Sequence, residues 1–189
     1  VKAIGLCNVP LGMQVKCAKL FDVDPSRVYV EFAGLNHFVF GRKVYVDGID
    51  RTQEVIDKMK DGKEISMKNI PNFSFPNHIL DAVGMIPAGY LKYYYTREKM
   101  VEDCKRAANE EGTRGEVVKK VEDELFELYK DVNLKVKPKQ LEQRGGAHYS
   151  EAAVNLIDSL YNDDGAVHFV NVRNNGTISD LPDDVAIEC

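Results

Sequence analysis

This sequence of 189 residues has no long apolar run and no close pair of cysteines. A helix that crosses a bilayer needs about 20 consecutive apolar residues, so the sequence predicts no membrane partner. The four cysteines lie far apart without a C-x-x-C spacing, which argues against a disulfide scaffold and against a structural zinc site. Free thiols are typical of a reducing compartment, and we expect a cytoplasmic protein.

Positive charge is scarce as well, since 25 basic residues face 30 acidic ones and the net charge is -5. A general nucleic-acid binder needs a basic surface that displaces counterions from phosphates. The sequence therefore predicts no nucleic-acid partner. It also lacks G-x-G-x-x-G, Walker, G-x-S-x-G and H-E-x-x-H motifs, so the residues that would bind a nucleotide cofactor are unknown and are expected outside this chain.

The remaining composition, 44% hydrophobic and 29% charged, is that of a globular protein with a sizeable core. The chain begins without Met in a strand-like segment, residues 2–6, and ends in another, residues 185–189. We therefore expect an internal piece of a longer protein. The pattern predicts an α+β fold, helix-rich with a small antiparallel sheet, in one domain over residues 1–189.

Hydrophobic periodicity places the elements. Apolar residues at helical spacing follow Pro10, and alternation over 28–33 and 38–46 predicts a hairpin with His37 near its turn. Further helices are predicted over 50–60, 78–110 with an interruption at 84–89, 114–132 and 150–161, and a buried strand over 166–172. The helix over 114–132 carries an apolar stripe of Val118, Val121, Leu125, Leu128 and Val132. On the helix over 150–161, the side chains predicted to face inward are Ala153, Leu156, Ile157 and Leu160.

Two residues of metal-binding type stand at element boundaries. Cys7 lies where a strand gives way to a helix, whose N-terminal field favours a thiolate; alternatively it is a small buried hydrophobe. His37 carries the commonest metal-ligating side chain, or is only a hydrogen-bonded turn residue. A metal with so few protein ligands would keep open positions, which suits catalysis better than structural support.

Tyrosines and arginines supply the other candidates. Tyr90, Tyr93 and Tyr94 share a helical face, where core packing is the default, although a phenol beside a metal can act as a base. Arg114 precedes an amphipathic helix. Arg144 and Ser150 flank two glycines at a helix start, which is either an anion site for phosphate or an ordinary capped loop.

In order along the chain, five segments resemble the motifs of glycoside hydrolase family 4, the NAD- and metal-dependent glycosidases. The resemblance spans nearly all of the sequence. Its residues are Lys2-Ala3-Ile4-Gly5-Leu6-Cys7, Gly34-Leu35-Asn36-His37, Pro87-Ala88-Gly89-Tyr90-Leu91-Lys92-Tyr93-Tyr94, Thr113-Arg114 and Asn174-Asn175-Gly176.

This resemblance implies a domain similar to the C-terminal domain of lactate and malate dehydrogenases. It implies that Cys7 and His37 bind a divalent metal, usually Mn in this family, and that Tyr90 is the catalytic base. NAD would be bound mainly by a preceding Rossmann domain, which is absent here together with a final helical portion. Asn8 replaces the acid found in the 6-phospho-α-glucosidases of the family, so the 6-phospho-β-glucosidases are the closer match.

The implied reaction is hydrolysis of a 6-phospho-β-glucoside, a phosphorylated disaccharide or aryl glucoside, by oxidation at C3, elimination and re-reduction. Asn8, Asn36, Arg114, Arg144 and Ser150 are the predicted substrate-binding residues. We expect the piece alone to be inactive and the full-length protein to form a homo-oligomer. The alternatives are a non-catalytic packing or oligomerisation domain of a dehydrogenase-like protein, and part of a 2-hydroxy-acid oxidoreductase.

Overall fold

The computed structural model describes residues 3–63, 74–110, 112–143, 146 and 148–189. These residues form two compact units. One unit contains the described residues up to Leu91 and from His148 to Cys189, and the other contains the described residues between these two ranges. The prediction that one substrate- and metal-binding domain spans both stays a prediction.

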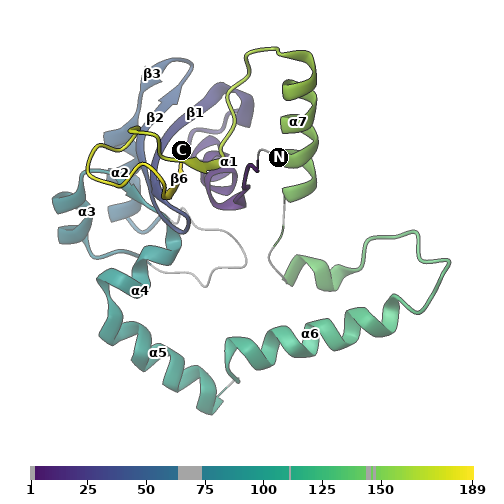
Figure 1. The fold of residues 1–189 in the computed structure, drawn as a ribbon. Coiled ribbons are helices and arrows are strands. Elements are labelled where there is room, and N and C mark those ends of the chain that lie inside the picture. The colour runs from purple at the N-terminus through teal and green to yellow at the C-terminus, as the bar shows by residue number, and fades with distance from the viewer. Residues whose placement is uncertain (1–2, 64–73, 111, 144–145, 147) are drawn as a thin grey trace. The chain divides into compact units, whose positions relative to one another are not determined.

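The first unit is built on an antiparallel sheet, in which the strand order is β3-β2-β1-β6-β5 and β4 pairs with β2 (Figure 1). The central pair is the predicted hairpin, and β6 brings the end of the chain beside β1. The strands are β1 (Val28–Leu35), β2 (Phe38–Val46), β3 (Ile49–Asp50), β4 (Ile86–Pro87), β5 (Asn171–Arg173) and β6 (Ala186–Glu188). The prediction of a small antiparallel sheet is confirmed.

Helices of the first unit lie largely where periodicity predicts them. Pro10 is tolerated in the first turn of α1 because no intrahelical partner is needed for its missing N–H. The helices are α1 (Asn8–Phe21), η1 (Pro25–Arg27), α2 (Thr52–Lys60), α3 (Asn77–Val83), η2 (Gly89–Leu91) and α7 (Tyr149–Asn162).

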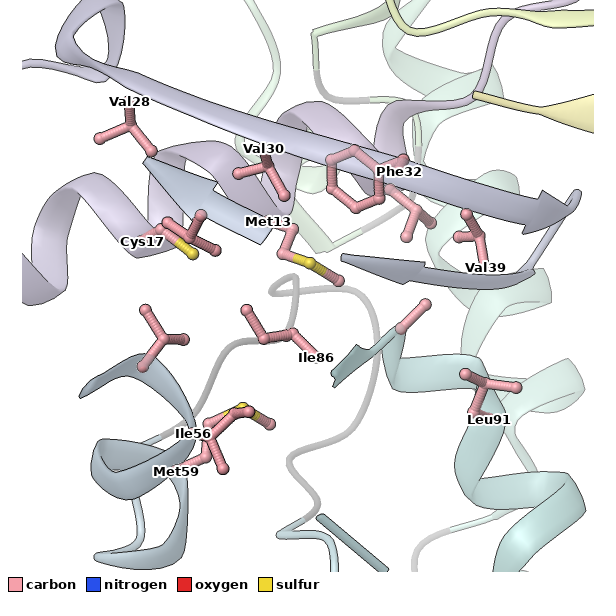
Figure 2. Close-up of a cluster of buried hydrophobic side chains, with 14 of the residues drawn as sticks. Met13, Cys17, Val28, Val30, Phe32, Val39, Ile56, Met59, Ile86 and Leu91 are labelled. Carbon is pink, nitrogen blue, oxygen red and sulfur yellow. The ribbon is translucent and has the colours of Figure 1, made fainter. Parts of the chain in front are cut away.

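The core of this unit lies between the hairpin and the helices α1 and α2 (Figure 2). Alternate residues of β1, namely Val28, Val30 and Phe32, point to the side on which Met13 and Cys17 of α1 lie. Ile56 of α2 and Ile86 of β4 complete the same cluster. Alternation on the strands and the 3.6-residue repeat on α1 therefore identify the core correctly.

Two predictions about burial in this unit are wrong. No residue of α7 is buried, and Ile157 and Leu160 are 65% and 63% exposed although they were expected to face inward. The segment 166–172 is not a buried strand, because β5 begins only at Asn171 and Val167 is 75% exposed. Periodicity indicates that a face is apolar, but it does not reveal what covers that face.

The second unit is helical, with α4 (Lys92–Tyr95), α5 (Arg97–Glu110), α6 (Arg114–Leu128) and η3 (Lys139–Gln143). A capping box of Thr113 and Glu116 starts α6, whose inward residues include Val121 and Leu125. Val132, expected on the same stripe, lies beyond the helix end and is 93% exposed. Among the described residues, no helix combines the length and apolar character needed to cross a membrane.

Candidate functional site

Cys7 is the N-cap of α1. Its backbone is extended, and its Sγ accepts a hydrogen bond from the Val9 N–H at 3.5 Å. The preceding segment is held against the sheet, since Gly5 forms a bridge with Asn171 of β5. The thiol is therefore fixed at the point where the chain leaves the sheet and enters the helix, and Cys7 is only 5% exposed.

The thiol is protonated at neutral pH in the absence of a metal. Burial, together with the carboxylate of Glu188, raises the pKa of Cys7 to about 11, although the hydrogen bonds from Val9 and Asn36 act in the opposite direction. As expected, the backbone N–H at the helix start favours the thiolate, but desolvation outweighs this effect.

His37 occupies the turn of the β1–β2 hairpin. Leu35 pairs with Phe38, so Asn36 and His37 are the two loop residues, and His37 has a left-handed φ of 65°. Gly34 allows this tight closure, because a Cβ at that position would collide with the Phe38 carbonyl oxygen and lie 2.8 Å from the Val39 Cα. The predicted turn position of His37 is confirmed.

Tyr90 comes from a distant segment but stacks on His37, with ring centroids 4.4 Å apart and planes at 20°. The sheet explains this approach, because Pro87 of β4 pairs with Phe40 of β2 and the Ala88 N–H donates to the Val39 carbonyl. Tyr90 follows two residues later in η2 and is partly buried against the core. Tyr93 and Tyr94 are instead exposed, so core packing does not explain them.

Glu188, which the sequence pattern does not single out, interacts both with the hairpin turn that carries His37 and with the Cys7 thiol. Its Oε2 accepts hydrogen bonds from the His37 N–H at 3.3 Å and from Asn36 Nδ2 at 3.5 Å. The residue is 1% exposed, and its Oε1 has no hydrogen-bond partner among the described residues. Burial raises the pKa of Glu188, whereas the Cys7 thiol and the His37 N–H lower it.

Tyr149 is the second residue that sequence reasoning missed. Burial raises its pKa, as do Cys7, Tyr90 and Glu188, while a backbone hydrogen bond from Asn8 lowers it. The phenol at the start of α7 therefore lies near the same groups. In the segment 144–150 the sequence pattern draws attention to the arginine and the serine, whereas the structure brings the tyrosine between them near Cys7 and Glu188.

The predicted substrate-binding residues fall in different places. Asn8 is buried in the first turn of α1, beside Cys7, and Asn36 is exposed in the hairpin turn. Ser150 is exposed in the first turn of α7. Arg114 belongs to the second unit, where its Nη2 donates to the Gln143 carbonyl at 3.3 Å, and Arg144 lies outside the described residues.

Cys7 offers a sulfur and His37 an imidazole nitrogen. Both are ligand types that bind divalent transition metals. Within the described part of the chain, no group of three or more histidine, cysteine and acidic residues has the geometry to hold a metal ion. The donor set thus fits an ion that takes its remaining ligands from substrate and solvent, and it does not fit a closed structural site.

Comparison with known proteins decides the family. Residues 32–189 match the C-terminal domain of family 4 glycosyl hydrolases. The chain belongs to this family. A Bacillus subtilis (strain 168) protein named as a probable 6-phospho-β-glucosidase is 53% identical to it over 188 residues, which are 99% of this chain and 42% of the relative. The alternative interpretation, that the chain is part of a 2-hydroxy-acid oxidoreductase, is therefore rejected.

Solved structures of the family share the fold. The Thermotoga maritima 6-phospho-β-glucosidase with NAD and glucose-6-phosphate has a TM-score of 0.80 and 38% identity, over 98% of this chain and 42% of that one. A form with manganese, NAD+ and glucose-6-phosphate has a TM-score of 0.77 at 38% identity, over the same shares. The predicted α+β, dehydrogenase-like fold is confirmed. The family 4 chain spans less than half the length of these relatives.

Proposed function

We propose that this family 4 chain is the metal- and substrate-binding portion of a 6-phospho-β-glucosidase. One observation carries the proposal: the His37 ring stacks on the Tyr90 ring at 4.4 Å, while the His37 backbone and the Cys7 thiol both interact with Glu188. Cys7, His37 and Tyr90, which come from three separate segments, are thus brought together at one end of the hairpin. They are the residues that the family resemblance implies as metal ligands and catalytic base.

The metal-binding pair in this proposal is Cys7 and His37. When bound there, a divalent ion, which we propose to be manganese, polarises an oxygen of the substrate as a Lewis acid. The manganese-containing relative at 38% identity supports this choice. Cys7 must lose its proton to bind the ion, and the hydrogen bonds from the Val9 N–H and Asn36 favour that loss because both lower the pKa of the thiol.

Tyr90 is the proposed base that removes the proton from C2 of the sugar. Tyr90 is partly buried against the core, and its ring stacks on the His37 imidazole. A proton next to a polarised carbonyl is acidic enough for a phenolate to remove. The carbonyl would form by hydride transfer from C3 to NAD, which we propose to be bound mainly outside this chain.

Position 8 favours the β-glucoside as substrate. A carboxamide cannot donate a proton as a carboxylic acid does, so Asn8, buried beside Cys7, suits substrate contact and not acid catalysis.

We propose Asn36 and Ser150 as further contacts to the phosphosugar, and Arg114 and Arg144 as contacts to its charged or reacting oxygens. Relatives with glucose-6-phosphate bound support a 6-phosphoglucoside, and we propose a cytoplasmic enzyme because the described cysteines are free.

A packing or oligomerisation role is the second candidate. The exposed apolar side chains of α7 favour it, since Val154, Ile157 and Leu160 are all more than 60% exposed and would be buried in an assembly. This role is compatible with a homo-oligomeric enzyme. A purely structural domain, however, would give no function to the contact between His37 and Tyr90.

Metal titration separates the two candidates. We expect Mn²⁺ to raise the thermal unfolding midpoint of the chain, and this stabilisation to vanish in Cys7→Ser and in His37→Ala. His148→Ala is the matched control, because that histidine is also exposed and contacts only Glu151 among the interactions described for its side chain. Indifference of the wild-type chain to Mn²⁺, or full stabilisation of both ligand variants, would contradict the proposed function.

A further inference from the structure

The carboxylate of Glu188 is buried at a position where burial is costly. It lies in the three-residue strand β6, is 1% exposed, and has no cationic partner among the interactions described for it. Burial of a carboxylate costs desolvation free energy, which hydrogen-bond donors must offset. The donors here are the His37 N–H and the Asn36 amide, and both belong to the hairpin turn.

The sheet explains how Glu188 reaches that turn. Glu188 pairs directly with Gly34 of β1 on one side and with Asn171 of β5 on the other. Directly opposed residues of an antiparallel pair project to the same face, and Gly34 has no side chain that would block the path. The carboxylate can therefore extend over β1 to the two loop residues of the hairpin.

The same row of residues continues to the Cys7 segment, because Gly5 is bridged to Asn171. Glu188 thus stands between the segment that carries the candidate sulfur ligand and the turn that carries the candidate imidazole. Its interactions with the Cys7 thiol and with Asn36, which itself hydrogen-bonds that thiol, join the two segments.

We infer that Glu188 is a positioning residue of the active site: its carboxylate fixes the Asn36–His37 turn relative to Cys7, so that thiol and imidazole are held in place for one metal ion. This inference rests on the proposed function of Cys7 and His37. It assigns to Glu188 no contact with the substrate or the ion. Carboxylates that orient metal ligands in this way typically change metal affinity about 10- to 100-fold when they are removed.

The test is a Co²⁺ titration of the chain with Cys104 and Cys189, the two cysteines that are not buried, replaced by Ser. Cys17 is fully buried, so the thiolate–cobalt charge-transfer band then reports on Cys7. We expect Glu188→Ala to weaken Co²⁺ binding by about tenfold or more. Glu188→Gln is expected to retain most of the affinity, because its amide oxygen can accept the same His37 N–H. Ile187→Ala is the matched control, since it removes a fully buried side chain from the same strand, and as the neighbour of Glu188 it projects to the opposite face of the sheet.

A metal-free readout keeps the inference separate from the proposed function. Hydrogen exchange of the His37 amide, followed by NMR, is expected to be slow in wild type and Glu188→Gln and faster in Glu188→Ala. If wild type shows no Co²⁺ band, the proposed function fails and the exchange rates alone judge the positioning role. Equal exchange in wild type and Glu188→Ala overturns the inference. Equal loss of affinity in Ile187→Ala, or in Glu188→Gln, overturns it as well.

Discussion

Replacing Gly34 by alanine tests how tightly the site-forming turn is constrained. A Cβ at this position would collide with the Phe38 carbonyl oxygen and lie 2.8 Å from the Val39 Cα. Both obstacles are backbone atoms of the facing strand, so no side-chain rotation can relieve the clash. The strand pair must separate locally, and with it the His37 turn must move.

Gly48 provides the control for the backbone conformation alone. Its φ is 78°, and an added Cβ would meet no atom within 4 Å. Gly48→Ala is therefore expected to cost roughly 1–2 kcal/mol, the penalty for an L-residue in a left-handed conformation. Gly34→Ala should cost about 1–3 kcal/mol more, as overpacking against a fixed structure does.

Urea denaturation followed by circular dichroism measures the difference. With a slope of about 2 kcal/mol/M, an excess of about 2 kcal/mol lowers the urea midpoint by about 1 M relative to Gly48→Ala. The His37–Tyr90 contact should be lost together with this stability. A Gly34→Ala midpoint equal to that of Gly48→Ala would refute the close approach of the strands at the turn.

Three further predictions concern titration and turnover. Burial raises the pKa of Cys7 from 9.0 to about 11 and that of Cys17 from 9.0 to about 12. Because the unfolded chain releases these two protons at a lower pH than the folded chain, the free energy of unfolding should fall as pH rises above about 9. The fall should be less steep in a variant that carries both Cys7→Ala and Cys17→Ala. In the full-length parent, Tyr90→Phe should lower turnover by about 10²- to 10⁴-fold and leave the melting temperature unchanged. Tyr94→Phe, at an exposed position, should leave turnover unchanged. If Tyr90→Phe kept its activity, the base would have to be another residue. The 189-residue chain alone should not hydrolyse a 6-phospho-β-glucoside, and robust hydrolysis by it would contradict a hydride acceptor site outside this chain.

Local patterns predict the elements that carry the ligands. The alternation that ends at Gly34 and resumes at Phe38 identifies the hairpin and puts His37 in its turn. The 3.6-residue spacing of Met13 and Cys17 identifies the buried face of α1, and Pro10 marks its first turn. These features depend on a few neighbouring residues, which is why the sequence reveals them.

Contacts between distant segments are not encoded locally. Glu188 reads as an ordinary acid near the end of a strand until β6 is known to pair with Gly34, 154 positions earlier by residue number. The contact of Tyr90 with His37 likewise requires the pairing of β4 with β2. On α7, the apolar pattern predicts burial of Ile157 and Leu160, yet both are exposed, because periodicity does not specify a partner.

We propose that Cys7 and His37 hold one ion beside Tyr90, and paramagnetic broadening by Mn²⁺ tests this arrangement most directly. In NMR spectra of the chain, substoichiometric Mn²⁺ is predicted to broaden first the signals of Cys7, His37 and Tyr90, and this broadening should disappear in Cys7→Ser. Broadening confined to acidic surface residues, or unchanged by the loss of the thiol, would contradict the account.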